Sequence, residues 1–226
     1  MVNIYVYYYL LMALFLGFFY LGFKNFRLAL GLFIIALPAY LLRFSVFGLP
    51  STALELIFGG LVLGWLVKYF KNDLPRMKSF ILQHKILFVF VALFLLFAAI
   101  GILVSGEYFK ALGIWRAYFL EPIILFFIIL GRSKEIKPKD LILFLSLSTI
   151  SISILAIIQK FTGWWIAEPI WADEATRRVT TFFSSPNAVG LYLVPITMLL
   201  LGPIIKKDKF KYLYLVILIL NLLAIF

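Results

Sequence analysis

Long apolar runs alternate with short polar segments, most of them basic, along the whole chain. A helix that crosses a bilayer needs about 20 mostly apolar residues. By this rule the pattern predicts eight membrane spans, at residues 4–23, 28–46, 52–69, 86–105, 112–130, 141–158, 187–205 and 212–226. The first run lacks the basic start and the small-residue cleavage site of a signal peptide, so we count it as a span. The expected fold is all-α, a polytopic transmembrane helix bundle of about eight spans.

The expected bundle forms a single membrane domain over residues 1–226. Its last apolar run stops at Phe226 without a polar residue after it. Because the charged end of a chain is costly inside hydrocarbon, we expect this sequence to be the N-terminal part of a longer protein.

The composition agrees with a membrane protein and excludes several kinds of site. The 226 residues are 65% hydrophobic and 14% charged, whereas soluble domains average about 45–50% apolar and about 25% charged residues. The sequence has no cysteine for a disulfide or a thiolate ligand, and its single histidine, His84, excludes a histidine-rich metal site. It also lacks the motifs of nucleotide-phosphate loops and zinc proteases. We expect neither a metal nor a cofactor.

Charge divides unevenly between the two sides that alternate spans create. One side carries 15 of the 21 lysines and arginines and four of the ten acids, in segments 24–27, 68–85, 132–140 and 206–211. The other side carries six of each, and its basic residues are Arg43, Lys110, Arg116, Lys160, Arg177 and Arg178. Because lysine and arginine gather in cytoplasmic loops, the first side is expected to face the cytoplasm and the N-terminus the outside. The same rule explains the net charge of +11 without a nucleic-acid partner.

The longest segment on the less basic side, residues 160–186, combines aromatic and cationic residues. Its tryptophans are typical of membrane interfaces, so we expect the segment to lie along the membrane surface; they are Trp164, Trp165 and Trp171. Arg177 and Arg178 follow them. A planar guanidinium donates two parallel hydrogen bonds to a phosphate and keeps its charge at every physiological pH.

Two interpretations of this arginine pair remain open. Pro186-Asn187 opens the next span, with Asn187 as the expected N-cap, and a helix N-terminus favours an anion. The arginines are therefore candidates for binding an anion at that point. Alternatively, they contact lipid headgroups or pair with Asp173 and Glu174, which lie four residues before them and would face them on a helix.

Further charged residues belong to the same predicted side. Arg116 and Glu121 fall in or near the fifth predicted span, where ionisable residues are costly unless they face a partner or a water-filled cavity. Their five-residue spacing is unfavourable for contact on one helix, so we expect each to meet another helix, and Glu121-Pro122 to mark a kink. Arg43 and Glu55 flank a turn on this side. Together these groups predict a basic cavity suited to an anionic, lipid-linked ligand.

The stretch RVTTFFSSPNAVGLYLVP, residues 178–195, resembles the arginine, phenylalanine, Pro-Asn and Gly-Leu-Tyr signature of the O-antigen ligase and polymerase family. The stretches LGIWRAYFLEPIILF and RFSVFGLPSTALELI are also similar to the N-terminal half of bacterial members, so the resemblance covers most of residues 28–205. It implies a membrane glycosyltransferase of the GT-C type that acts in cell-surface polysaccharide biosynthesis. Such an enzyme transfers glycan from an undecaprenyl-diphosphate carrier to a lipid or glycan acceptor outside the bacterial cytoplasmic membrane, without metal or nucleotide sugar.

The resemblance also implies roles for residues. Arg178 matches the family's arginine before Pro-Asn, and the implied diphosphate ligands are Arg178, Arg177, Arg116 and Arg43, with Pro186, Asn187 and Glu121 shaping the site. Family members continue into a large outer loop that carries another arginine and, in ligases, a histidine base. We therefore expect the catalytic residues to lie outside this chain, and the chain alone to be inactive. Alternatives are a polysaccharide polymerase of the same family, a transporter or flippase for lipid-linked sugars, and a non-catalytic membrane scaffold.

Overall fold

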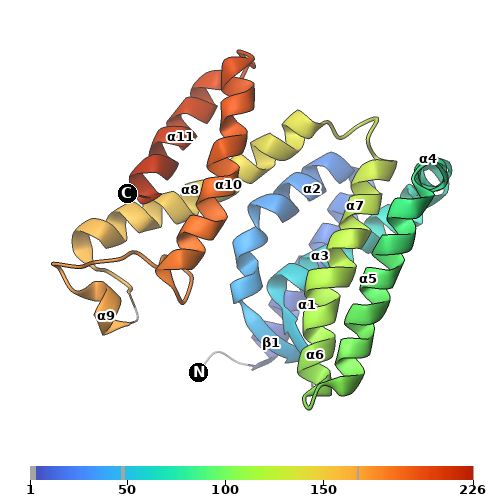
Figure 1. Ribbon diagram of the computed structural model, residues 1–226, viewed down its shortest axis with the longest axis horizontal. Helices are drawn as coiled ribbons and strands as arrows, with labels where there is room; N and C mark the ends of the chain where they lie inside the picture. The colour runs from blue at the N-terminus through green and yellow to red at the C-terminus, as the bar shows by residue number, and fades with distance from the viewer. Residues whose placement is uncertain (1–3, 47–48, 167, 226) are drawn as a thin grey trace. The chain divides into compact units, whose positions relative to one another are not determined.

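A computed structural model describes residues 4–46, 49–166 and 168–225, and these are mainly helical (Figure 1). Among these described residues, four helical segments are long and apolar enough to cross a membrane: α5 (Lys85–Val104), the segment Tyr108–Gly131, α8 (Pro138–Thr162) and α10 (Pro186–Ile205). A fifth is reached if α3 (Ala53–Lys68) and α4 (Phe70–Gln83), which meet at a bend of 96°, count as one broken span. The all-α expectation is confirmed, and the helices are compatible with a multi-pass membrane protein. Eight spans are not confirmed.

The remaining apolar helices are shorter. They are Tyr8–Lys24, which is part of α1 (Ile4–Lys24), then α2 (Phe26–Ile35) and α11 (Lys211–Ile225). The prediction of one span over residues 28–46 is wrong. After α2 the chain forms a 3-10 helix, η1 (Leu37–Leu41), and then strand β1 (Arg43–Val46), which pairs with antiparallel strand β2 (Leu49–Thr52). Pro38 explains the change, because its ring removes a backbone donor and clashes with the preceding helical turn.

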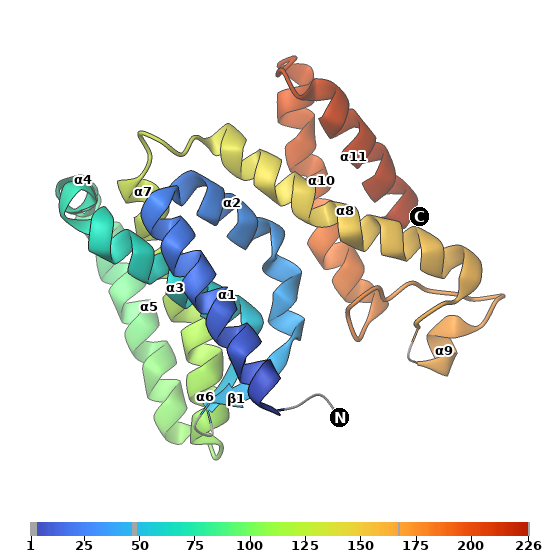
Figure 2. The same ribbon diagram turned by 180° about the vertical axis from the view of Figure 1, so that it is seen from behind.

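The chain divides into two compact units, and each is described by itself. The first comprises residues 1–33 and 42–137, and the second comprises residues 34–41 and 138–226. In the first unit α1 packs along α3 (Figure 2). Gly64 of α3 makes this approach possible, because a Cβ there would lie 2.6 Å from the Phe19 carbonyl oxygen. Gly60 similarly faces the backbone of Phe15, so small residues four positions apart let two helix backbones meet.

Helix α5 also belongs to the first unit and has an unusual surface. It is apolar at every position after its first residue, Lys85, yet the structure, which describes all of its residues, buries none of them. Large side chains such as Phe97 and Val104 are 66% and 81% exposed. Contiguous apolar surface of this kind is rare on soluble proteins and is expected where a helix faces lipid.

In the second unit α8, α10 and α11 pack on one another. Polar side chains connect them inside the bundle: the Ser148 and Tyr192 hydroxyl oxygens lie 2.7 Å apart. Asn221 of α11 accepts a hydrogen bond from the Ser153 hydroxyl at 2.8 Å and donates one to the Thr197 hydroxyl oxygen at 3.1 Å. Such interhelical hydrogen bonds hold membrane helices in register where lipid supplies no hydrophobic drive for association.

Candidate functional site

A buried glutamine fixes the segment that carries the arginine pair. Gln159 of α8 is 0% exposed. Its Oε1 accepts hydrogen bonds from the backbone N–H of Thr180 at 3.0 Å and of Thr181 at 2.7 Å. Its Nε2 donates to the Trp165 carbonyl oxygen at 3.2 Å. One side chain thus ties both ends of the loop between α8 and α10 to the last turns of α8.

Arg177 donates two side-chain hydrogen bonds to backbone carbonyl oxygens, one in this loop and one in α8. Its Nε donates to the Ala172 carbonyl oxygen at 3.2 Å, and its Nη1 donates to the Lys160 carbonyl oxygen at 3.1 Å. Lys160 in turn donates from Nζ to the Arg177 carbonyl oxygen at 3.2 Å. The guanidinium lies against Gly163, where a Cβ would come within 3.1 Å of Nη2. Arg177 therefore stabilises the conformation of the loop and also contributes a positive charge to it.

Arg178 is more exposed, and its guanidinium is held between an aromatic ring and an amide. Its Cζ lies 5.1 Å from the centre of the Trp171 ring, a cation–π contact. Its Nη2 donates to Asn187 Oδ1 at 2.9 Å. The short helix α9 (Pro169–Ala172) positions the tryptophan, whose carbonyl oxygen accepts a hydrogen bond from the Arg178 backbone N–H at 3.0 Å.

The start of α10 differs by one residue from the prediction. Pro186 is the first helical residue, and the N-cap is Ser185, whose hydroxyl oxygen accepts from the Asn187 N–H at 3.3 Å. The prediction of Asn187 as the cap is therefore wrong. Proline fits the first helical position because its fixed φ is already helical and its missing N–H is not needed there. The Asn187 carboxamide is consequently available to orient Arg178.

The alternative interpretation, that the arginines pair with upstream acids, does not hold in the described part of the chain. Asp173 instead accepts hydrogen bonds from the backbone N–H of Ala175 at 3.0 Å and of Thr176 at 3.2 Å. The segment is a turn, so the i, i+4 alignment that a helix would give is lost. Among the described residues neither Arg177 nor Arg178 forms an ion pair with a carboxylate.

A cavity of about 810 Å³ opens beside these arginines within the second unit. Its cationic lining consists of Lys160, Arg177 and Arg178, and none of the described lining residues is acidic. The N-terminal turn of α10 lies at the same place, through Pro186 and Asn187. The rest of the lining is mainly apolar. Val179 comes from the loop, and the other residues come from α10 and α11: Val189, Gly190, Leu191, Val194, Pro195, Leu223, Ala224 and Ile225.

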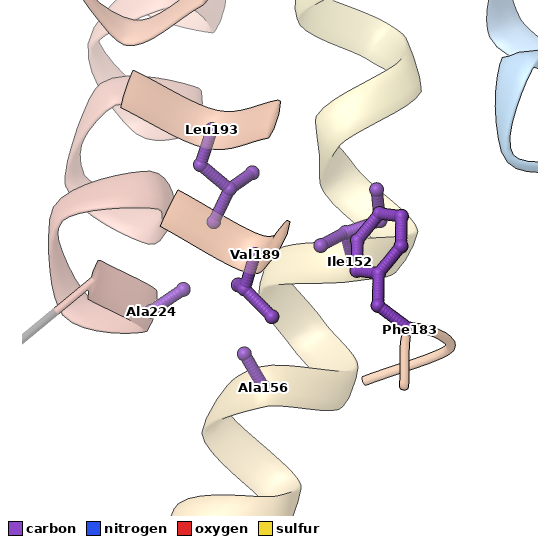
Figure 3. Close-up of a cluster of buried hydrophobic side chains, with 6 residues drawn as sticks. All are labelled: Ile152, Ala156, Phe183, Val189, Leu193 and Ala224. Atoms are coloured by element: carbon purple, nitrogen blue, oxygen red, sulfur yellow. The ribbon is translucent and has the colours of Figure 1, made fainter. Parts of the chain in front are cut away.

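The apolar wall of the cavity continues into the core of the second unit. Val189 and Ala224 line the cavity and also belong to a cluster with Ile152, Ala156, Phe183 and Leu193 (Figure 3). The stick view shows these side chains converging from α8, α10, α11 and the loop before α10. A cavity with a cationic rim and an apolar wall suits an amphiphile with an anionic head.

The first unit contains the other predicted residues. Arg116 pairs with Glu55 of α3 and donates from Nη2 to the Pro50 carbonyl oxygen at 2.9 Å, so the expectation that it meets another helix is confirmed. Its Nε also lies 3.6 Å from Glu121 Oε1. The expectation that their five-residue spacing is unfavourable for contact is wrong, because residues Arg116–Leu120 form a π-helix, η2, between α6 (Tyr108–Trp115) and α7 (Glu121–Gly131). A π turn bonds i to i+5 and places such residues on one face.

The predicted ligands are thus divided between the two units. Arg177, Arg178, Pro186 and Asn187 come together at the cavity. Arg43 is an exposed residue of β1 opposite Thr52, in the first unit with Arg116 and Glu121. Sequence reasoning missed Lys160 as a lining residue. It placed Trp171 at the membrane interface without predicting its contact with Arg178, and it did not single out Gln159, which lies far from the arginine pair in sequence.

Comparison with protein-family models, with curated proteins and with solved structures finds no match for the chain. The geometry of the cavity therefore carries the functional conclusion.

Proposed function

We propose that the chain is an O-antigen ligase-like glycosyltransferase of the bacterial cytoplasmic membrane. In this proposal it takes a glycan from an undecaprenyl-diphosphate carrier to an acceptor outside the cytoplasm, and its own share is to bind the donor. The observation that carries the proposal is the cavity of the second unit, which joins three cationic side chains and a helix N-terminus to an apolar wall. The resemblance of residues 178–195 to the family signature supports the same class.

The cavity chemistry matches the needs of this reaction. When the glycan leaves its carrier, negative charge develops on the diphosphate, and fixed donors aimed at that charge lower the barrier. Arg178 and Lys160 supply positively charged side chains, and the N-terminus of α10 adds backbone dipoles that favour an anion. The apolar wall from α10 and α11 would hold the first isoprene units of the carrier. None of these contributions requires a metal.

Binding of a prenyl diphosphate tests the donor site directly. We expect Arg178→Ala to weaken binding of farnesyl diphosphate by about 10- to 100-fold, the effect of removing one charge-assisted hydrogen bond. Arg178→Lys should recover part of the loss, since it keeps the charge but not the planar fork. The control is Lys110→Ala, which removes an exposed cation from the first unit, outside the cavity. Binding can be measured by calorimetry in detergent, with farnesol as the ligand that lacks phosphate.

Transfer in cells tests the reaction class. With the protein expressed in bacteria that make the glycan, Arg178→Ala should abolish or strongly reduce glycan transfer, as seen on a gel at equal protein level. Unchanged transfer in both Arg178 variants would refute the diphosphate role. If Arg178→Ala loses farnesyl diphosphate binding but transfers glycan normally, the cavity binds prenyl diphosphates without taking part in the transfer reaction.

A further inference from the structure

Helix α4 is short, basic and set at an angle to its neighbour. It follows α3 after a single residue and bends away from it by 96°. One of its faces packs on the protein: the Phe80 ring lies 6.2 Å from the Phe126 ring of α7 and 6.0 Å from the Phe88 ring of α5. The sequence pattern alone did not predict a helix here, because the segment is too polar to count as a span.

Specific polar contacts attach α4 to the C-terminal end of α7. Arg76 donates a hydrogen bond to the carbonyl oxygen of Gly131, the last residue of α7. Asp73 is buried, accepts from Trp65 Nε1 at 2.9 Å and lies 3.8 Å from Arg132. The Arg132 guanidinium also stacks 3.9 Å from the centre of the Tyr69 ring. These bonds place α4 where the apolar segment Tyr108–Gly131 ends.

On the opposite face of α4, every charged side chain is positive. Lys71 and Lys78 are exposed and lie two helical turns apart, on the same face. Lys85, the first residue of α5, is exposed as well. Asp73, the single acid of α4, is buried on the packed side. Within the described residues none of these three lysines forms an ion pair.

We propose that α4 is an interfacial helix that lies along the membrane surface and binds the phosphates of anionic lipid headgroups through Lys71, Lys78 and Lys85. An amphipathic helix with a basic polar face is suited to this position. If α4 instead continued α3 as a second half-span, Lys71 and Lys78 would enter hydrocarbon, where charged side chains are costly. The inference rests on α5 and Tyr108–Gly131 crossing the membrane and is independent of the proposed transfer reaction.

The depth of α4 in the bilayer is the first test. The chain has no cysteine, so single cysteines can carry spin labels at the exposed positions Asn72, Ser79 and Gln83. In vesicles of phosphatidylcholine and phosphatidylglycerol, accessibility to oxygen and to a nickel complex should place all three labels at headgroup depth. A half-span would instead shift depth by up to about 16 Å between the first and the last label. Labels at Leu87 and Leu96 of α5 provide the comparison, since their depths should differ.

The lipid preference is the second test. Lys71→Gln, Lys78→Gln and Lys85→Gln, combined in one chain, should reduce the preference for spin-labelled phosphatidylglycerol over phosphatidylcholine. About fivefold is expected per lysine near an anionic surface. The matched control removes the same charge at the exposed lysines after α10, by Lys206→Gln, Lys207→Gln and Lys209→Gln. A depth gradient along α4, or an unchanged lipid preference in the α4 triple variant, overturns the proposal. The depth test uses single-cysteine chains that keep all three lysines, so it stands even if the triple variant fails to fold.

Discussion

At the scale of single residues, Gln159 fixes the position of the loop that carries the arginine pair, although it lies far from the pair in sequence. Its side chain makes hydrogen bonds to the segments on both sides of Arg177 and Arg178 while staying fully buried. Gln159→Leu keeps a similar volume but leaves the backbone N–H groups of Thr180 and Thr181 without acceptors. We expect a loss of about 2–4 kcal/mol in unfolding free energy, measured by denaturation in detergent. The exposed Gln83 is the control. An equal loss of stability in Gln83→Leu would contradict the role of the Gln159 hydrogen bonds.

The same residues show what sequence reasoning can reach at this scale. The arginine pair and the helix start at Pro186-Asn187 were found because residue type and spacing carry their own chemistry. Gln159 was missed because a lone glutamine in an apolar helix shows its partners only when the loop folds back over it. The exact cap was missed because Ser185 and Asn187 are both good N-caps, and the neighbouring proline decides between them.

At the scale of elements, the close approach of α1 to α3 depends on glycines. Leucine at position 64 would place its Cβ 2.6 Å from the Phe19 carbonyl oxygen and 2.7 Å from the Phe23 nitrogen, so the helices would have to separate. We expect Gly64→Leu to destabilise the first unit by more than about 2 kcal/mol. Gly101→Leu in α5 is the matched control, because no atom lies within 4 Å of a Cβ there. Thermal unfolding of both variants in detergent tests this prediction. Similar melting temperatures for the two variants would contradict it.

The ends of helices were predictable where the length of an apolar run is enough to determine the structure. The starts and ends of α5, α8 and α10 lie within four residues of the predicted spans, because a long apolar run has few alternatives to a helix. The run 28–46 failed because apolar length does not report the backbone break at Pro38 or the hairpin that follows it. The π turn at Arg116 was also beyond the spacing rule, which assumes an α-helix throughout.

At the scale of the whole molecule, the four long apolar segments are sufficient to explain the charge distribution. If α5, Tyr108–Gly131, α8 and α10 each cross the membrane, the basic segments 68–85, 132–140 and 206–211 share one side. The loop that carries Arg177 and Arg178 then lies on the other side. This alternation does not depend on whether α1, α2 or α3 crosses. The proposed outward-facing cavity therefore needs fewer spans than the sequence pattern predicted.

Cysteine labelling tests this alternation in cells. Because the chain has no cysteine, Ala175→Cys, Lys209→Cys and Ser133→Cys each introduce a unique, exposed thiol. A membrane-impermeant maleimide should label Ala175→Cys in intact cells, since this position lies on the less basic side and lysine-rich loops stay in the cytoplasm. Lys209→Cys and Ser133→Cys should react only after the membrane is disrupted, and all three should react equally in detergent. The opposite pattern would turn the arginine cavity toward the cytoplasm and remove the outward-facing donor site. Labelling of both Ala175→Cys and Lys209→Cys from outside would instead show that α10 does not cross the membrane. The result at position 175 must therefore be read together with the result at position 209.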